Sequence, residues 1–219
     1  NFIVNNRGNV YSAGIGPSNN LIFGSGSGNP SMSGDANTIV GTIVANTSTT
    51  GYNNVYVGYG IGTNATTANR NVIVGALAAA GLTTAQRMVI VGNQAGASIT
   101  TAGDAVIIGY AAANTLTTGI RNTVIGYSAG RNMTSNSGLN VLIGDSVAQY
   151  ITGSDNTIVG VQAAYTTSGS RNIAFGRYAF LNGQGDDNIV IGASAASSGT
   201  YYNKVIIGNL LLGDQTSGS

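Results

Sequence analysis

The sequence predicts an all-β fold, a parallel β-solenoid (β-roll) of about 12 coils of 16–18 residues. Two observations predict it. A short apolar phrase that ends in Gly recurs at a nearly constant spacing, and this phrase is rich in β-branched residues. A fixed period of this size is typical of repeat architectures. Each phrase is too short for a helix but long enough for a strand, so we expect one strand in every coil.

The repeated phrase is an Asn, three apolar residues and a Gly, and its most regular copy covers residues 71–75. The closing glycines lie 17 residues apart as far as Gly126, then 18, and then 16 to the end. A Gly at this place in every coil indicates a positive φ or a close approach of two backbone segments. These glycines are Gly24, Gly41, Gly58, Gly75, Gly92, Gly109, Gly126, Gly144, Gly160, Gly176, Gly192 and Gly208.

The other positions of a coil are identified by counting from its closing Gly. The third residue after the Gly is small and apolar, and the seventh is a larger apolar residue in the middle coils, as in Ala78 and Leu82. A Thr-Thr pair follows in five successive coils, from residues 49–50 to 117–118. We therefore expect a strand, a sharp turn at Gly, a short second strand with Ala inside, and a return rich in Thr, Gly and Asn.

Stacked coils place equivalent side chains above one another at about 4.8 Å, the spacing of neighbouring strands. The Asn that opens each phrase should then form a ladder of amide hydrogen bonds, and the residue before it should form a column of weak charge pairs that set the register. The Asn column is Asn20, Asn37, Asn54, Asn71, Asn122, Asn140, Asn156, Asn172 and Asn188, interrupted by Met88, Ala105 and Lys204. The charge column is Arg70, Arg87, Asp104, Arg121, Asp155, Arg171 and Asp187.

The composition excludes several classes of function. Charged residues are only 7% of the 219 residues, the net charge is +1, and His, Cys and Glu are absent. A nearly neutral chain is not expected to bind nucleic acid, and no apolar run is long enough to insert into a membrane. The common nucleophile–base pairs and metal clusters cannot be assembled, so we predict no enzyme activity, no metal and no cofactor.

The domain organisation is expected to be simple. Residues 37–208 form the solenoid without a linker, residues 1–36 form an irregular N-terminal coil and loop region, and residues 209–219 form a terminal cap or the start of the next segment. The chain opens without Met and ends in a Gly/Ser tail, so we expect it to be a piece of a longer polypeptide.

The triplets are apolar at all three positions, although side chains alternate between the two faces of a strand. One face can fill the lumen of the coil, but the other would leave a long apolar stripe in water, beyond what monomers usually expose. We expect a closed homo-oligomer that buries this stripe; a covering segment from elsewhere or a bulged strand are the alternatives. The middle column, which serves either the oligomer or the lumen, includes Ile39, Ile73, Ile90, Ile107, Val124, Leu142, Ile158, Val190 and Ile206.

Residues 122–129, Asn-Thr-Val-Ile-Gly-Tyr-Ser-Ala, resemble the Asn-Thr-Ala-Val-Gly-Tyr-x-Ala repeats of bacteriophage tail fibres, and so do residues 156–163. The Thr-Thr-Gly of residues 117–119 resembles the links between such repeats. The pattern is also similar to the β-roll heads of trimeric autotransporter adhesins, whose coils are shorter. The resemblance covers residues 37–208 and implies a homotrimeric, fibrous part that binds a cell surface.

Few side chains suggest a binding site. Tyr59, Tyr110 and Tyr127 share the column just after the Gly and are candidates for receptor contact, because aromatic faces stack on sugars. Asp186 and Asp187 are adjacent acids, which we interpret as a polar turn rather than a glycosidase pair or a calcium site. A rank of Thr pairs could order water, but we expect it to stabilise the stack.

The expected function is a rigid trimeric shaft of a bacteriophage tail or head fibre, which displays or forms a receptor-binding surface for host attachment. Its partners would be sister copies, other fibre or virion segments, and a host glycan or surface protein, and it would be located on the virion. One alternative is a bacterial trimeric autotransporter-type adhesin head on the cell surface. A second alternative is a monomeric ice- or surface-binding solenoid.

Overall fold

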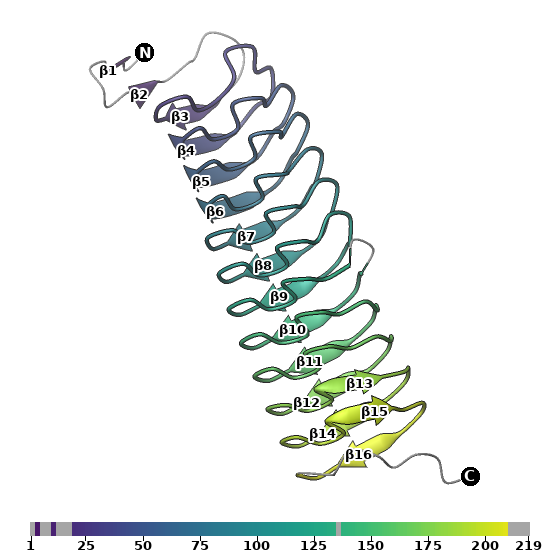
Figure 1. Ribbon diagram of the computed structural model, residues 1–219. Coiled ribbons are helices and arrows are strands. Elements are labelled where there is room, and N and C mark those ends of the chain that lie inside the picture. Colours follow the sequence, from purple (N-terminus) through teal and green to yellow (C-terminus); the bar gives the residue numbers. More distant parts are fainter. Residues whose placement is uncertain (1–2, 5–9, 12–18, 135–136, 210–219) are drawn as a thin grey trace.

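The computed structural model describes residues 3–4, 10–11, 19–134 and 137–209, and none of these residues is helical. The chain coils into a rod in which twelve strands stack in parallel along one side (Figure 1). The twelve strands bound about 11 turns, so the predicted parallel β-solenoid is confirmed.

The main sheet follows chain order, and equivalent triplet residues pair in register from one strand to the next, as in Ile73 with Ile90. A short N-terminal pair, β1 (Ile3–Val4) and β2 (Val10–Tyr11), joins it in antiparallel orientation. The parallel strands are β3 (Leu21–Phe23), β4 (Thr38–Thr42), β5 (Val55–Tyr59), β6 (Val72–Ala76), β7 (Val89–Val91), β8 (Val106–Ile108), β9 (Thr123–Ile125), β10 (Val141–Ile143), β11 (Thr157–Val159), β12 (Ile173–Phe175), β14 (Ile189–Ile191) and β16 (Val205–Ile207).

The solenoid begins earlier than predicted. Strand β3 pairs in parallel with β4, and the segment after it continues the ladder, since Gly28 N–H donates to the Val44 carbonyl at 2.8 Å and Ser33 N–H to the Thr49 carbonyl at 2.7 Å. The N-terminal coil and loop region expected over residues 1–36 thus includes one coil that is already part of the stack. Of the predicted C-terminal cap, residues 210–219 lie outside the described part.

The predicted second strand is absent from most of the described coils. The chain turns after the closing Gly, with left-handed backbone at the second and fourth residues, as in Leu77 (φ 55°) and Ala79 (φ 46°). Left-handed residues at alternate positions bend the chain too sharply for an extended strand. A second pair of strands, β13 (Asn182–Gln184) and β15 (Ser198–Thr200), forms only near the C-terminal end of the described stack.

Gly is required at the closing position of each coil for steric reasons. The φ angles of these glycines lie between 131° and 150°, a region that other residues rarely adopt. A Cβ at Gly75 would lie 2.3 Å from the Gly92 carbonyl oxygen, and the same approach repeats between successive glycines along the stack. Adjacent coils thus touch backbone to backbone at this corner.

The lumen is apolar and closely filled. The middle residue of each triplet points inward, and Ile73, Ala78 and Leu82 show how one coil fills the interior with three side chains that have no exposed surface. Tyr56 takes the middle position in β5, where burial raises the pKa of its hydroxyl, which has no hydrogen-bond partner.

The Asn column forms the expected ladder at the edge of the lumen. Asn172 illustrates it: its N–H and its Nδ2 both donate to Asn156 Oδ1, at 3.0 and 3.1 Å, and Nδ2 also donates to the Gly185 carbonyl at 2.9 Å. Asn172 is fully buried. Because these amides have each other and the return backbone as partners, a one-residue slip of any coil would leave buried polar groups unpaired.

Candidate interaction surface

The outward face of the main sheet is uncharged and mostly apolar along the stack, with Thr at three positions of its first column. In each rung the first and third triplet residues point outward, and the middle residue points inward. The first column is Leu21, Thr38, Val55, Val72, Val89, Val106, Thr123, Val141, Thr157, Ile173, Ile189 and Val205. The third column is Phe23, Val40, Val57, Val74, Val91, Ile108, Ile125, Ile143, Val159, Phe175, Ile191 and Ile207. We call these two columns the outer face; none of their 24 residues is charged.

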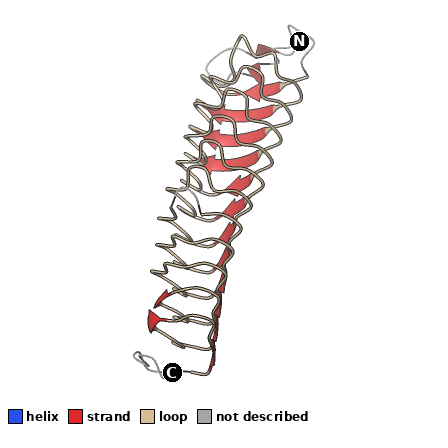
Figure 2. Cartoon of the chain, turned by 90° about the vertical axis from the view of Figure 1, so that its right-hand side faces the viewer, coloured by secondary structure: helices blue, strands red, loops and turns tan. Residues whose placement is uncertain are grey.

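The outer face is long, narrow and partly accessible. Twelve rungs at about 4.8 Å and a width of about 10 Å give a strip of roughly 500 Å². Most of its side chains are half-buried, and the more exposed ones within the stack reach values such as 37% for Val89 and 39% for Ile191. The strands form one ladder along the rod, as Figure 2 shows in red. A patch of this size equals the largest apolar patch of a typical monomer, and such patches are often functional.

The structure assigns the middle column of the triplets to the lumen. Ile39, Ile107 and Val190 are buried, and Ile206, in the last described rung, is half-buried. The sequence left this column open between lumen and oligomer, and it did not name the two outward columns as a site. Alternation along the strand was the signal that could have identified them.

The charge column borders the outer face where the strands begin, and we call this border the first rim. Arg87 and Asp104 form an ion pair there, with Nη2 and Oδ2 at 3.0 Å, and Arg171 binds Asp187 through two contacts of 2.6 and 2.8 Å. The hydrogen bond from each arginine lowers the pKa of its partner carboxyl. The Arg70 guanidinium lies 5.5 Å from the centre of the Tyr52 ring.

The column just after the closing Gly borders the other side of the outer face, and we call it the second rim. Two of the three candidate tyrosines meet there: the rings of Tyr110 and Tyr127 stack at 5.3 Å between centroids. Tyr59 lies three rungs away, although it is equally exposed. Because Tyr110 and Tyr127 each turn one ring face toward the other, each has only its second face to offer to a sugar.

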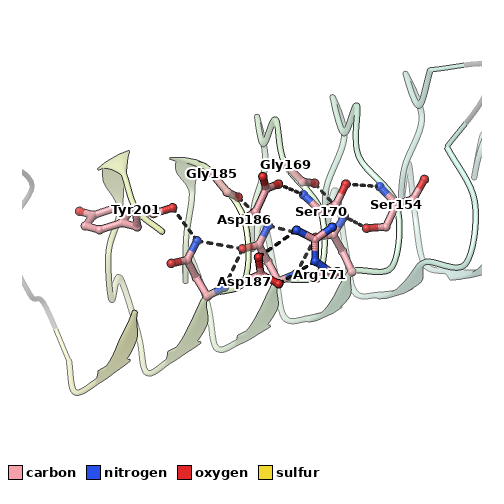
Figure 3. A network of polar contacts seen from close by, with 11 residues as sticks. Ser154, Gly169, Ser170, Arg171, Gly185, Asp186, Asp187 and Tyr201 are labelled. Carbon is pink, nitrogen blue, oxygen red and sulfur yellow. Dashed lines mark hydrogen bonds and ion pairs between the residues drawn. The ribbon is translucent and has the colours of Figure 1, made fainter. Parts of the chain in front are cut away.

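The two adjacent acids are engaged in contacts within the chain (Figure 3). Asp186 Oδ1 accepts the Ser170 N–H at 2.7 Å, and Ser170 Oγ in turn accepts the Ser154 N–H at 3.1 Å, while Asp187 pairs with Arg171. Both carboxylates therefore tie neighbouring coils together. Among the described residues, no three His, Cys, Asp or Glu side chains gather as a metal cluster would require.

The Thr pairs also connect successive coils. The first Thr of a pair donates its hydroxyl to the carbonyl of the equivalent Thr one rung on, as from Thr83 to Thr100 at 2.9 Å and from Thr100 to Thr117 at 3.2 Å. The second Thr of each pair, such as Thr84, is exposed. One hydroxyl of each such pair thus serves the stack itself.

Comparison with known proteins adds no family assignment: no family model matches the chain, and neither a curated protein nor a solved structure gives a significant match. No helix that could cross a membrane occurs in the described ranges.

Proposed function

We propose that the chain is a rigid segment of a homotrimeric fibre of the bacteriophage tail-fibre type, which supports attachment to a host surface. The observation that carries the proposal is the outer face, which is free of charge over twelve rungs although charged residues occur on both of its rims. An extended apolar strip of this kind is stabilised when another apolar surface excludes water from it.

A second copy of the chain fits this strip because it has the same length and the same rung spacing. Parallel copies arranged around an axis along the rod would bury all outer faces at once, and closed cyclic symmetry is the common form of homo-oligomers. The number three comes from the resemblance to phage fibres and adhesin heads.

A trimer of this kind would act by stiffness and by repetition. Backbone ladders and the buried Asn column hold each coil to the next, so the rod can carry a binding surface away from its attachment point. Threefold display raises the avidity for a host glycan or surface protein. Other fibre segments would join at its ends, and the assembly would be located on the virion. A bacterial adhesin head would use the same assembly on a cell surface, and the flanking sequence distinguishes the two.

The assembly is tested by light scattering coupled to size-exclusion chromatography. We expect three chain masses for the native sequence. The double variant Val89→Lys/Ile108→Lys places one charge in each outward column on adjacent rungs and should give monomers, because burying unpaired charges is costly. The control Thr84→Lys, on the exposed return, should remain trimeric. A monomeric native chain would contradict the proposal and favour the monomeric ice- or surface-binding alternative.

Attachment is tested separately by sedimenting the labelled trimer with bacterial cells. Binding that the Val89→Lys/Ile108→Lys monomer loses would support multivalent attachment. Equal binding by the monomer would contradict it.

A further inference from the structure

We propose that two charge pairs, Arg121–Asp145 and Asp155–Arg177, connect the rims of neighbouring copies and hold them parallel and in register. This inference rests on the proposed homotrimer and adds how its three copies are aligned with one another. It starts from the charges that the rims carry and that the single chain leaves without an ion-pair partner.

The first rim has two internal ion pairs, Arg87–Asp104 and Arg171–Asp187. Arg121 and Asp155 lie in the same column, are exposed, and belong to neither pair. Arg121 acts on Asp104, and Asp155 on Arg171, only through the field of their charges.

The second rim carries two charged residues in its described column, Asp145 and Arg177, and both are exposed. Asp145 takes part in neither ion pair found in the described part of the chain. The Arg177 guanidinium lies 4.5 Å from the centre of the Tyr178 ring and donates to the Tyr178 hydroxyl at 2.9 Å, but it contacts no carboxylate of the described coils.

The two rims cannot meet within one chain. Five residues of nearly extended backbone lie between them in each rung, so the six steps from rim to rim correspond to about 20 Å. In a parallel cyclic assembly, however, the first rim of one copy lies against the second rim of the next. In an antiparallel pair of outer faces, related by a twofold axis across the rod, each rim would instead face the same rim of the partner.

The order of the charges matches between the rims. Arg121 precedes β9 and Asp145 follows β10, so the positive charge lies one rung toward the N-terminus. Asp155 precedes β11 and Arg177 follows β12, which repeats the same one-rung step with opposite charges.

A separation of one rung is the distance that Arg–Asp pairs already span in this molecule, as in Arg171–Asp187 at 2.6 Å between β12 and β14. Copies without axial slip can therefore form both new pairs. In that arrangement the residue of the neighbouring copy that lies level with Asp145 is the uncharged Leu139, so the nearest opposite charge is Arg121, one rung away. A slip of one rung would set Asp145 level with Asp155 in one direction and with Arg121 in the other, and closed cyclic symmetry, which places equivalent rungs at one height, excludes both. Charge order of this kind fixes alignment more than it adds affinity.

The inference is tested by charge reversal and rescue, with the trimer–monomer equilibrium followed by analytical ultracentrifugation. Each exposed pair contributes roughly 2- to 5-fold, so three copies of Asp145→Arg should raise the dissociation constant about 10-fold or more. Adding Arg121→Asp should restore it. Adding Arg70→Asp, which has the same net charge on the same rim three rungs away, should not.

Zero-length carbodiimide cross-linking gives an independent readout. With Arg121→Lys, the amine at position 121 should form an amide with the carboxylate of Asp145 from a neighbouring copy, with loss of water, and mass spectrometry locates the link. A trimer that is indifferent to Asp145→Arg, or that links position 121 to another rung or to its own rim, would overturn the alignment while the trimer stands. A native monomer would instead overturn the proposed function itself.

Discussion

The 17-residue coils before β9 and the 16-residue coils after β10 build the same rung with different returns. Both have the Asn ladder and the closing Gly, and their triplets pair in register. The third residue before the ladder position is Ala85 in one region and Gly169 in the other, and each offers its carbonyl to an Asn Nδ2. The 16-residue coils between β10 and β14 have Gly at this position, as Gly153, Gly169 and Gly185, whereas the 17-residue coils have either Gly (Gly34, Gly51 and Gly119) or Ala (Ala68, Ala85 and Ala102).

The lumen is also filled from different positions in one coil of the second region. In the first region the fourth residue after the Gly is small and the seventh is large, as in Ala79 and Leu82. In the coil of β12 the fourth is Phe180, which is fully buried, and the seventh is Gly183. A Cβ at Gly183 would lie 2.1 Å from the Phe180 ring. The coil of β12 therefore keeps the lumen full by exchanging volume between these two positions, while the coil of β10, with Ala148 and Ile151, keeps the arrangement of the first region.

The strongest test of this comparison is Gly169→Ala against Ala85→Gly. A Cβ at Gly169 would lie 2.1 Å from the Gly185 carbonyl oxygen, and its φ of 145° is unfavourable for Ala. We expect Gly169→Ala to lower the free energy of unfolding by about 4 kcal/mol or more, since backbone has to move. Ala85→Gly should cost only about 1 kcal/mol. Denaturant titration measures both, and equal costs would show that the shorter return does not depend on its glycines.

The second test exchanges the two ways of filling the lumen. Phe180→Ala should cost about 3–5 kcal/mol, because it leaves a cavity where Gly183 offers no side chain. Backbone strain is not a cause, since Ala164 and Ala196 hold the same position with a similar φ. Adding Gly183→Leu recreates the Ala79 and Leu82 arrangement and should recover part of the loss.

The measurement is again denaturant unfolding of the single and the double variant, with Gly183→Leu alone as the control. That control should be strongly destabilised, because Phe180 still occupies the space. If the double variant is no more stable than Phe180→Ala, the two positions do not share one volume.

The comparison also shows what sequence could and could not predict. The rung was predictable because the Asn, the apolar triplet and the Gly are each required at fixed spacing, and the Asn ladder followed from their stacking. The second strand was predicted wrongly, because nothing in residues such as Leu77 or Gln94 announces a left-handed backbone. The first coil was predicted only in part: its strand was identified from the repeat at residues 20–24, but Pro30 and a run of Gly and Ser made the following segment look like a loop, although its backbone continues the ladder.

The outer face was foreseen as a stripe, but its residues were not identified, because the burial of the middle column settles which two columns remain outside. The ion pairs of the first rim could not be identified from the sequence for another reason. Which charges pair within the chain depends on side-chain reach between rungs, and the sequence gives only their order.

The smallest expected effect concerns the two internal ion pairs, one in each region. The pKa values of Asp104 and Asp187 are lower in the folded chain than usual, so the unfolded chain binds protons at higher pH. Their stabilisation is therefore complete above the unfolded pKa of about 4 and is lost as the pH falls through the folded pKa. Both pairs are exposed, so removing one should shift the melting temperature at pH 7 by about 2 °C at most.

The two ion pairs differ in the charges that surround them, so their contributions to stability can be compared between the two regions. Arg121 adds a second positive charge near Asp104, whereas Asp187 has Arg171 alone as its source of a lowered pKa. We therefore expect Asp104→Asn to lower the melting temperature at pH 7 more than Asp187→Asn, and both effects to shrink between pH 7 and pH 2 as the carboxylates are protonated. Calorimetry at the two pH values measures this. The reverse order would mean that the charge of Arg121 does not add measurably to the stability of the Arg87–Asp104 pair.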